Sequence, residues 1–493
     1  MNQQARSVET AETSAGPEGE AGRIALCVDL DGTLIRSDLL VESLFALLGR
    51  QPVTGLRLPF WLAAGKARFK HRIAARTDLD IAALPYNEDV VEFVRAERAK
   101  GRRIVLATAS HEKFATAVAR HLDLFDAVVA TGDGGANLAG EAKLDRILAE
   151  LDGQPFDYIG NARADLAIWA AAHRAILVEP SAGLARAARR VATVAKVFPR
   201  PRDRAGAYFK ALRPHQWAKN LLMFLPLAMG HKLGEPTLVW QAALGFVAFS
   251  LCASSVYLLN DLIDLESDRR HPRKRFRPFA AGRVPLTHGL ALIPVLLLAS
   301  LAVALVLPFP FLPVLGFYYV CTLAYSLKLK RISSLDVLVL AGLYTLRIIA
   351  GAAAVLVMPS FWLLAFSMFF FLSLAMVKRY AELLSVRDQG GSAAAGRNYQ
   401  SVDMETLAQL GSGSGYCAVL VLALYVNSDQ VRLVYGRPEV IWLFCPLLLY
   451  WITRVWLGTR RGKMHDDPVV FAIRDRVSLM LGAIGAVIWI AAL

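Results

Sequence analysis

The sequence has few charged residues for its length. Of its 493 residues, 19% are charged and 55% are hydrophobic, whereas about 25% are charged in an ordinary soluble domain. The shortage is uneven: residues 1–210 mix charged and apolar side chains, while from about Leu221 onward apolar stretches alternate with short polar loops. The sequence therefore predicts a soluble N-terminal part and a membrane-embedded part, with the boundary near 200–215.

Cysteine is also scarce, and a secretion signal is missing. The five cysteines stand in apolar runs without metal-ligand spacing, which argues against a disulfide framework and fits a reducing cytosol for the soluble part. They are Cys27, Cys252, Cys321, Cys417 and Cys445. Residues 1–22 lack the apolar core of a signal peptide, so we expect a disordered tail there.

Nine apolar stretches follow, each near the length of about 20 residues that crosses a bilayer. They are about 214–231, 237–259, 287–307, 310–327, 336–357, 360–380, 405–427, 438–457 and 474–493. Lysine and arginine gather in every second loop, which by the positive-inside rule places these loops and the N-terminal part in the cytosol. The net charge of +14 is thereby explained without nucleic acid. We expect a multi-pass protein of a bacterial inner membrane.

The most informative motif lies at the cytosolic end of the second stretch. It runs from Asn260 to Asp268 (NDLIDLESD), and its carboxylates Asp261, Asp264 and Asp268 are spaced to share one face of a helix. Clustered carboxylates beside an amide oxygen suit Mg²⁺, which bridges to substrate phosphates. A basic run follows that can bind phosphate oxygens: Arg273, Lys274, Arg275 and Arg277. The alternative is a solvated loop that only sets the topology.

This motif resembles the first aspartate motif of the UbiA superfamily of intramembrane prenyltransferases, and nine spans with cytosolic catalytic loops fit that family. Within it, the sequence over about residues 205–493 resembles the decaprenyl-phosphate phosphoribosyltransferases. The motifs that carry this resemblance are Leu212–Asn220 (LRPHQWAKN), Arg269–Pro278 (RRHPRKRFRP), Lys378–Glu382 (KRYAE) and Asp466–Arg476 (DDPVVFAIRDR).

One region departs from the wider superfamily. Aromatic prenyltransferases of this kind carry a second D-x-x-x-D array after the fourth span. Here that region holds Tyr325 and Lys328, then the single carboxylate of Asp336, with Arg347 inside the fifth span. We interpret Arg347 as a phosphate ligand or a partner of Asp336, with a packing role as the alternative.

The resemblance implies Mg²⁺-dependent transfer of a 5-phosphoribosyl group from phosphoribosyl diphosphate to a polyprenyl phosphate, with release of diphosphate. It implies Mg²⁺ at the catalytic residues Asp261, Asp264 and Asp268. The residues expected to bind substrates are Arg213, Gln216, Lys219, Asn220, Asn260, Arg269, Lys274, Arg275, Arg277, Tyr325, Lys328, Asp336, Arg347, Lys378, Arg379 and Glu382. Two alternatives stay open: an aromatic prenyltransferase, which the missing second array opposes, and a non-catalytic protein that binds or transports a lipid phosphate.

The soluble part carries the motifs of another family. An apolar strand runs into Asp29-Leu-Asp31-Gly-Thr, which resembles the first motif of the haloacid dehalogenase superfamily and implies Asp29 as nucleophile and Asp31 as acid and base. The resemblance also implies that Thr108 binds the substrate phosphate and that Lys143 offsets the negative charge of the aspartates and the phosphate. It implies Asn161 and Asp165 as Mg²⁺ ligands in addition to Asp29 and Asp31. Because Asn161 replaces the family's aspartate, the domain is either a phosphatase acting on the 5-phosphate of the membrane product or a regulatory or scaffolding remnant.

The expected fold is thus an α/β Rossmann-like domain with a helical cap, fused to an all-α bundle of nine transmembrane helices. The expected boundaries are 1–22 for the tail, 23–185 for the haloacid dehalogenase-like domain with its cap at about 37–100, 186–212 for a basic linker on the anionic inner leaflet, and 213–493 for the transmembrane transferase.

Overall fold

The computed structural model describes residues 24–493 apart from 133–137, 201–202, 389, 391–397, 430, 432–434 and 465–466. The predicted tail, 1–22, lies outside the described residues. The chain forms two compact units. The first contains the residues up to Tyr208 together with Asp261–Gly289, and the second contains Phe209–Asn260 and Leu290–Leu493. The loop that carries the aspartate motif therefore belongs to the first unit.

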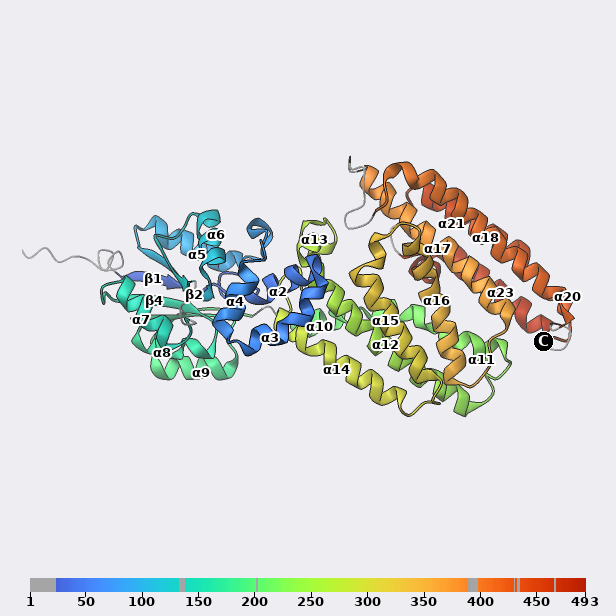
Figure 1. The fold of residues 1–493 in the computed structure, drawn as a ribbon, viewed down its shortest axis with the longest axis horizontal. Coiled ribbons are helices and arrows are strands. Elements are labelled where there is room, and N and C mark those ends of the chain that lie inside the picture. Colours follow the sequence, from blue (N-terminus) through green and yellow to red (C-terminus); the bar gives the residue numbers. More distant parts are fainter. Residues whose placement is uncertain are drawn as a thin grey trace, which may run out of the picture. The chain divides into compact units, whose positions relative to one another are not determined.

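A parallel six-stranded sheet is the centre of the first unit (Figure 1). Its strand order is β3-β2-β1-β4-β5-β6. Buried apolar runs form the central strands because both faces of such a sheet are covered, whereas the edge strand that ends at Phe198 is mostly exposed. The strands are β1 (Ala25–Val28), β2 (Ile104–His111), β3 (Ala127–Thr131), β4 (Phe156–Gly160), β5 (Arg174–Val178) and β6 (Val194–Phe198). The predicted α/β domain is confirmed.

Helices cover the two faces of the sheet (Figure 1). Leu26 and Val28 pack in one apolar cluster with one group of helices, whereas Ala25 and Cys27 pack in another cluster with a second group. Alternate residues of a strand point to opposite faces, so the groups lie on opposite faces. The groups are α5 (Glu88–Ala99) with α6 (Glu112–Leu122), and α7 (Glu141–Glu150) with α8 (Leu166–Ala171) and α9 (Ala182–Val191).

The sheet extends into 186–212, the segment predicted as a basic linker. Strand β6 pairs with β5 in parallel, and α9 buries Leu184 and Ala188 while Arg189 and Arg190 stay exposed. The arginines that indicated a linker thus occupy the outer side of an amphipathic helix. The α/β domain continues at least to Phe198, and the short helix α10 (Arg204–Ala211) follows it.

The helical cap is shorter than the predicted range of 37–100. Helix α5 packs on the sheet, because its buried Val90 and Val94 belong to the same apolar cluster as β1. The helices before it have a small core of their own, formed by Leu47, Trp61 and Phe69 with Ile73. The cap elements are α2 (Leu39–Arg50), η1 (Pro52–Arg57), α3 (Leu58–Ala63) and α4 (Lys66–Ala74).

The described part of the second unit is helical (Figure 1). Its elements, two of which start or end in the first unit, are η4 (Pro214–Phe224), α11 (Leu225–Met229), α12 (Pro236–Ile263), α14 (Leu286–Ala304), α15 (Phe311–Leu327), η6 (Leu329–Arg331), α16 (Leu335–Ala354), α17 (Phe361–Asp388), η7 (Ser401–Asp403), α18 (Met404–Val426), α20 (Pro438–Ile441), α21 (Phe444–Arg460), α22 (Pro468–Arg474) and α23 (Arg476–Ala492).

Six helices among the described residues are long and apolar enough to cross a membrane, or seven if α22 and α23, bent by 79°, form one span. The predicted all-helical membrane region is confirmed, but nine spans are not reached. The first predicted stretch is a 3-10 helix followed by the short α11, with a proline near the start of each. The fourth, Phe311–Leu327, has 17 residues, and the ninth, Arg476–Ala492, also has 17 and begins just after the bend.

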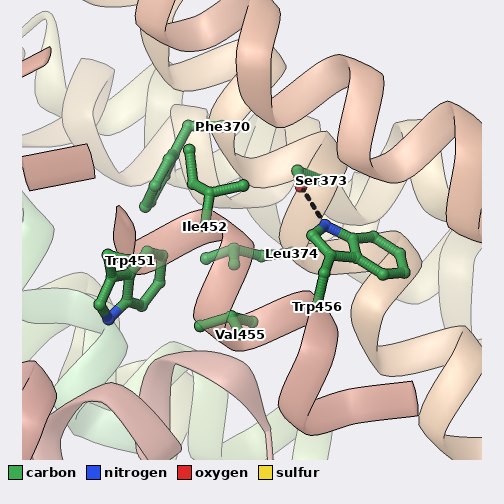
Figure 2. A pocket seen from close by; sticks show the side chains of 7 residues that line it. All are labelled: Phe370, Ser373, Leu374, Trp451, Ile452, Val455 and Trp456. Carbon is green, nitrogen blue, oxygen red and sulfur yellow. Dashed lines mark hydrogen bonds between the residues drawn. The ribbon is translucent and has the colours of Figure 1, made fainter. Parts of the chain in front are cut away.

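Helices α17, α18 and α21 run side by side (Figure 1). Gly411 and Gly415 of α18 allow this approach, since a Cβ on Gly411 would lie 2.2 Å from Trp456 Cζ2. Figure 2 shows the neighbouring packing between α17 and α21, where the indole of Trp456 donates a hydrogen bond of 3.1 Å to Ser373 Oγ. The apolar cavity at this place is too narrow for water, so it is not a groove for a polyprenyl chain.

Candidate functional site

The aspartate motif does not form one helical face. Helix α12 ends at Ile263, Asp264 has non-helical dihedral angles (φ −92°, ψ 13°), and α13 (Leu265–Arg270) begins after it. The sequence prediction of a continuous helix was wrong because aspartate favours the residue before a helix over a helix interior. Asp261 and Asp268 therefore come from different helices, and Asn260 lies in the last turn of α12.

Asp261 and Asp268 nevertheless converge on one cation. Arg277 Nη1 lies 3.2 Å from Asp261 Oδ1 and 2.5 Å from Asp268 Oδ2, and both aspartates are 2% exposed. Burial raises the pKa of Asp268, and Arg277 opposes that rise. Two buried carboxylates around a positive charge have the donor chemistry that a hard cation requires. Within the described residues, no three acidic, histidine or cysteine side chains form a metal cluster, so Asp264 as a third ligand stays a prediction.

The basic residues after the motif have different surroundings. Arg269, predicted to bind substrate, donates two hydrogen bonds to Glu42 of the cap. Lys274 and Arg275 are exposed, and the Arg275 guanidinium lies 4.9 Å from the ring centroid of Phe276. Among these cations, Arg277 contacts the aspartates.

A second cluster joins three helical elements of the second unit. Asp467 precedes α22, and its Oδ2 lies 2.6 Å from Lys219 Nζ of η4 and 3.2 Å from Lys378 Nζ of α17. Tyr344 of α16 donates a hydrogen bond of 2.9 Å to Asp467 Oδ1. The sequence predicted both lysines but missed Asp467 and Tyr344 as site residues. The only signal for Asp467 was the motif Asp466–Arg476, whose first residue lies outside the described residues.

Arg347 is held by neutral groups. Its Nε donates to Asn220 Oδ1 at 2.9 Å and its Nη2 to the Tyr318 hydroxyl at 3.2 Å. The rings of Phe249, Tyr318 and Tyr344 lie 5.2–5.7 Å from the guanidinium carbon, within cation–π range. The predicted pairing of Arg347 with Asp336 is not present.

Asp336 pairs with Arg379 instead. Arg379 Nε lies 2.6 Å from Asp336 Oδ2, and both side chains are at most 1% exposed. Tyr325 donates to Asp336 Oδ1 at 2.8 Å, and Arg379 Nη1 contacts Glu382. Three further predicted residues lie apart from these pairs in the contacts seen: Arg213 beside the Tyr257 ring, Gln216 in η4 and exposed Lys328 after α15.

The haloacid dehalogenase motifs meet at the carboxyl ends of β1, β2 and β4. Lys143 Nζ lies 2.9 Å from Asp29 Oδ1. Asp31 accepts hydrogen bonds from the Leu39 amide at 2.8 Å and from Ser110 Oγ at 2.5 Å, with the Thr108 hydroxyl 3.5 Å away. Burial raises the pKa of Asp31 to about 7, and nearby Asp38 adds to the rise. Asp31 can therefore hold a proton near neutral pH, as an acid catalyst must.

Asp165, predicted as a metal ligand, accepts hydrogen bonds on both of its carboxylate oxygens. Its Oδ2 accepts hydrogen bonds from the amides of Asn161 and Ala162 at 3.1 and 2.9 Å, and its Oδ1 accepts one from Tyr158. Asp165 thus supports the loop that presents Asn161. A Cβ on Gly32 would lie 2.1 Å from Asn161 Nδ2, so the Asn161 amide reaches the Asp29–Thr33 loop, and its oxygen has the donor chemistry for Mg²⁺ without the charge.

Comparison with known proteins identifies both parts. The model of the UbiA prenyltransferase family matches residues 221–490, more than half of the chain. The protein belongs to the UbiA prenyltransferase family. The model of the haloacid dehalogenase-like hydrolases matches residues 26–169. This UbiA-family protein is therefore a fusion of a multi-pass membrane transferase region with a haloacid dehalogenase-like domain.

Three relatives show how far the likeness extends. The uncharacterized protein y4nM of Sinorhizobium fredii is 36% identical over 467 residues, covering 94% of this chain and 90% of its own. Nodulation protein NoeC of Azorhizobium caulinodans is 36% identical over 55% of this chain and 89% of its own. The decaprenyl-phosphate phosphoribosyltransferase of Mycolicibacterium smegmatis is 32% identical over 59% of this chain and 94% of its own.

Proposed function

We propose that the membrane region transfers a 5-phosphoribosyl group from phosphoribosyl diphosphate to a polyprenyl phosphate. The likeness to the mycobacterial enzyme over nearly its whole length supports this. The structural observation that carries the proposal is the convergence of Lys219 and Lys378 on Asp467. Two lysines gathered on one carboxylate are spaced to share an anionic group, and a reaction between two phosphorylated substrates needs such cations.

Asp261 and Asp268 are the residues proposed to hold Mg²⁺, with Asp264 as a third oxygen ligand. The ion would neutralise charge on the leaving diphosphate. In the reaction, an anionic oxygen of the polyprenyl phosphate forms the bond to ribose C1 while the bond from C1 to diphosphate breaks. Because that oxygen is already deprotonated at neutral pH, the chain needs no general base. Lys219 and Lys378 bind phosphate, and the apolar tail lies among the membrane helices.

We also propose nine membrane crossings, with the N-terminal domain and the aspartate loop in the cytosol of a bacterial cell. The bend between α22 and α23 and the short elements η4, α11 and α15 then complete crossings together with the six long helices. The basic loops support this orientation through the positive-inside rule.

The test uses the purified full-length protein in proteoliposomes with Mg²⁺. Labelled phosphoribosyl diphosphate and decaprenyl phosphate should give a labelled, lipid-extractable product and equimolar diphosphate. Asp261→Asn and Asp268→Asn should each lower the rate about a hundredfold or more, as loss of a transition-state contact does. Asp429→Asn, at an exposed position, is the matched control. Prenyl transfer to an aromatic acceptor without use of phosphoribosyl diphosphate would instead support the aromatic prenyltransferase.

A second activity is favoured by the contacts of Asp29 and Asp31. The Lys143–Asp29 pair and the raised pKa of Asp31 suit a phosphatase with Asp29 as nucleophile. We propose the 5-phosphate of the lipid product as its substrate. Full-length protein should release phosphate from that lipid, Asp29→Asn should accumulate the phosphorylated lipid without slowing transfer, and Asn161→Asp should release phosphate faster. If neither the parent nor Asn161→Asp releases phosphate from it, the domain does not act on this substrate.

A further inference from the structure

The aspartate loop, defined here as residues 261–282, packs against the cap within the first unit. Arg269 Nη1 lies 3.1 Å from Glu42 Oε2, and Arg269 Nη2 lies 2.5 Å from Glu42 Oε1. The two side chains are 8% and 4% exposed. Removing one member of such a sheltered, two-pronged pair leaves the other charge buried without a partner, which is strongly unfavourable.

Further contacts between the aspartate loop and the cap region lie on both sides of the Glu42–Arg269 pair. Arg270 Nε lies 2.9 Å from Asp80 Oδ2, just before the short helix η2 (Ile81–Ala83). At the end of α2, Arg50 lies 3.5 Å from Glu266. The chain also approaches closely without charges: a Cβ on Gly282 would lie 2.7 Å from Arg36 Cβ. Complementary charges and a close backbone approach thus involve the cap and the segments on either side of it, at Arg36 and Asp80.

Arg269 also closes the aspartate loop on itself. Its Nε donates a hydrogen bond of 3.1 Å to the carbonyl oxygen of Ala280, so one guanidinium ties the start of the loop to its end. Glu42 is held in turn by Ser37, whose hydroxyl donates to Glu42 Oε1. The guanidinium that closes the loop is therefore oriented by a carboxylate that the cap itself fixes. Asp268, the neighbour of Arg269, is one of the two aspartates bound to Arg277.

From this geometry we infer that Glu42 is a positioning residue for the membrane transferase, and that the cap of the haloacid dehalogenase-like domain is the docking surface for the aspartate loop. Glu42 does not touch a substrate. It holds Arg269, which holds the loop closed and so sets where Asp268 lies. The catalytic consequence rests on the proposed phosphoribosyl transfer, whereas the docking itself does not.

The test compares Glu42→Gln with Glu92→Gln in the full-length protein. Glu92 is an exposed glutamate of the same domain, so its variant controls for the loss of a carboxylate. Loss of a charged hydrogen-bond pair should raise hydrogen exchange in peptides from 262–282 about tenfold or more. It should lower kcat for transfer and leave KM for the polyprenyl phosphate near the parent value. The pair Glu42→Arg with Arg269→Glu should restore part of both properties.

A second variant keeps the docking testable if Glu42→Gln does not fold. Asp80→Asn removes one of the two acidic partners of the exposed Arg270, the other being Glu266, and should raise exchange in the same peptides by a smaller factor. Parent-like exchange in every folded variant overturns the docking. Faster exchange with an unchanged kcat overturns the positioning role. A parent that transfers no phosphoribosyl group overturns the proposed function, and in that case the exchange experiment still decides the docking.

Discussion

Lys219 and Asp467 lie 248 positions apart in the sequence, and their side chains meet at 2.6 Å. Lys378 shares the same carboxylate oxygen at 3.2 Å. One negative charge between two lysines leaves a net positive charge, which an arriving phosphate group would neutralise. Under the proposed function, Asp467 would keep the two lysines together for a phosphate group.

We predict that Asp467→Asn destabilises the protein and that diphosphate restores stability. Without the carboxylate, two sheltered ammonium groups lose their shared partner, at a cost of about 3–5 kcal/mol for a fully buried pair. Thermal unfolding in detergent should show a lower Tm, and millimolar diphosphate should raise the Tm of the variant more than that of the parent. Glu439→Gln, at an exposed position, should behave like the parent. An unchanged Tm in Asp467→Asn would contradict the prediction.

Two glycines of α18 offer a matched pair of substitutions. A Cβ on Gly411 would lie 2.2 Å from Trp456 Cζ2, whereas a Cβ on Gly413 would meet nothing within 4 Å. Gly411→Ala should therefore destabilise the bundle by about 1–3 kcal/mol through overpacking, and Gly413→Ala should stabilise it by about 0.5–1 kcal/mol through helix propensity. Thermal unfolding should therefore show a lower Tm for Gly411→Ala and a higher Tm for Gly413→Ala. Equal shifts would mean that α18 does not approach α21 in this way.

The stability of the α/β domain should fall in acid partly through Glu97. Burial alone would raise the pKa of Glu97, but hydrogen bonds from Lys100 and Arg102 lower it below its ordinary value. A lowered folded pKa gives stability that is present above the unfolded value of about 4.3 and is lost as pH falls below it. Calorimetry of the full-length protein should show a smaller loss of Tm between pH 6 and pH 3.5 in Glu97→Gln. Glu92→Gln, on the same helix, should keep the dependence of the parent.

The proposed orientation places residues 358 and 463 on opposite sides of the membrane. Met358 is 91% exposed between α16 and α17, and exposed Lys463 follows α21. In a Cys417→Ser background, Lys463→Cys should react with an impermeant thiol reagent only from the cytosolic side. Met358→Cys should react only from the other side. Reaction of both from the same side would exclude the nine-crossing topology.

The sequence predicted the elements of this protein better than their ends and contacts. Apolar runs such as Ala25–Val28, whose pattern indicates a strand and nothing else, form strands in the structure. The charge of the segment 186–212 predicts a linker because it outweighs the few apolar residues, such as Ala188 and Phe198, that pack α9 and β6 on the domain. Periodicity also could not show the break at Asp264, because the spacing of the aspartates is the same in a straight helix and in a broken one.

Contacts in the site were easier to predict between residues close together in the sequence than between distant ones. Asp29 and Asp31 sit in one short motif, and in the structure burial raises the pKa of Asp31 and the charge of Asp29 contributes to the rise. Arg347 and Asp336 are near in sequence, but the expected pairing between them was wrong. The carboxylate of Asp336 pairs instead with Arg379 from another helix. Asp467 was missed as a site residue because its partners come from helices that only the folded bundle brings together.

The contact between Glu42 and Arg269 also has a consequence for biosynthesis. Glu42 leaves the ribosome 227 residues before its partner, and translation at about 5–20 residues per second makes the interval about 10–45 s. During that time, α12 has to enter the membrane before the aspartate loop can return to the cap. During this interval the N-terminal domain exposes Glu42 without Arg269, and slow membrane insertion would lengthen the exposure of this surface to chaperones and proteases.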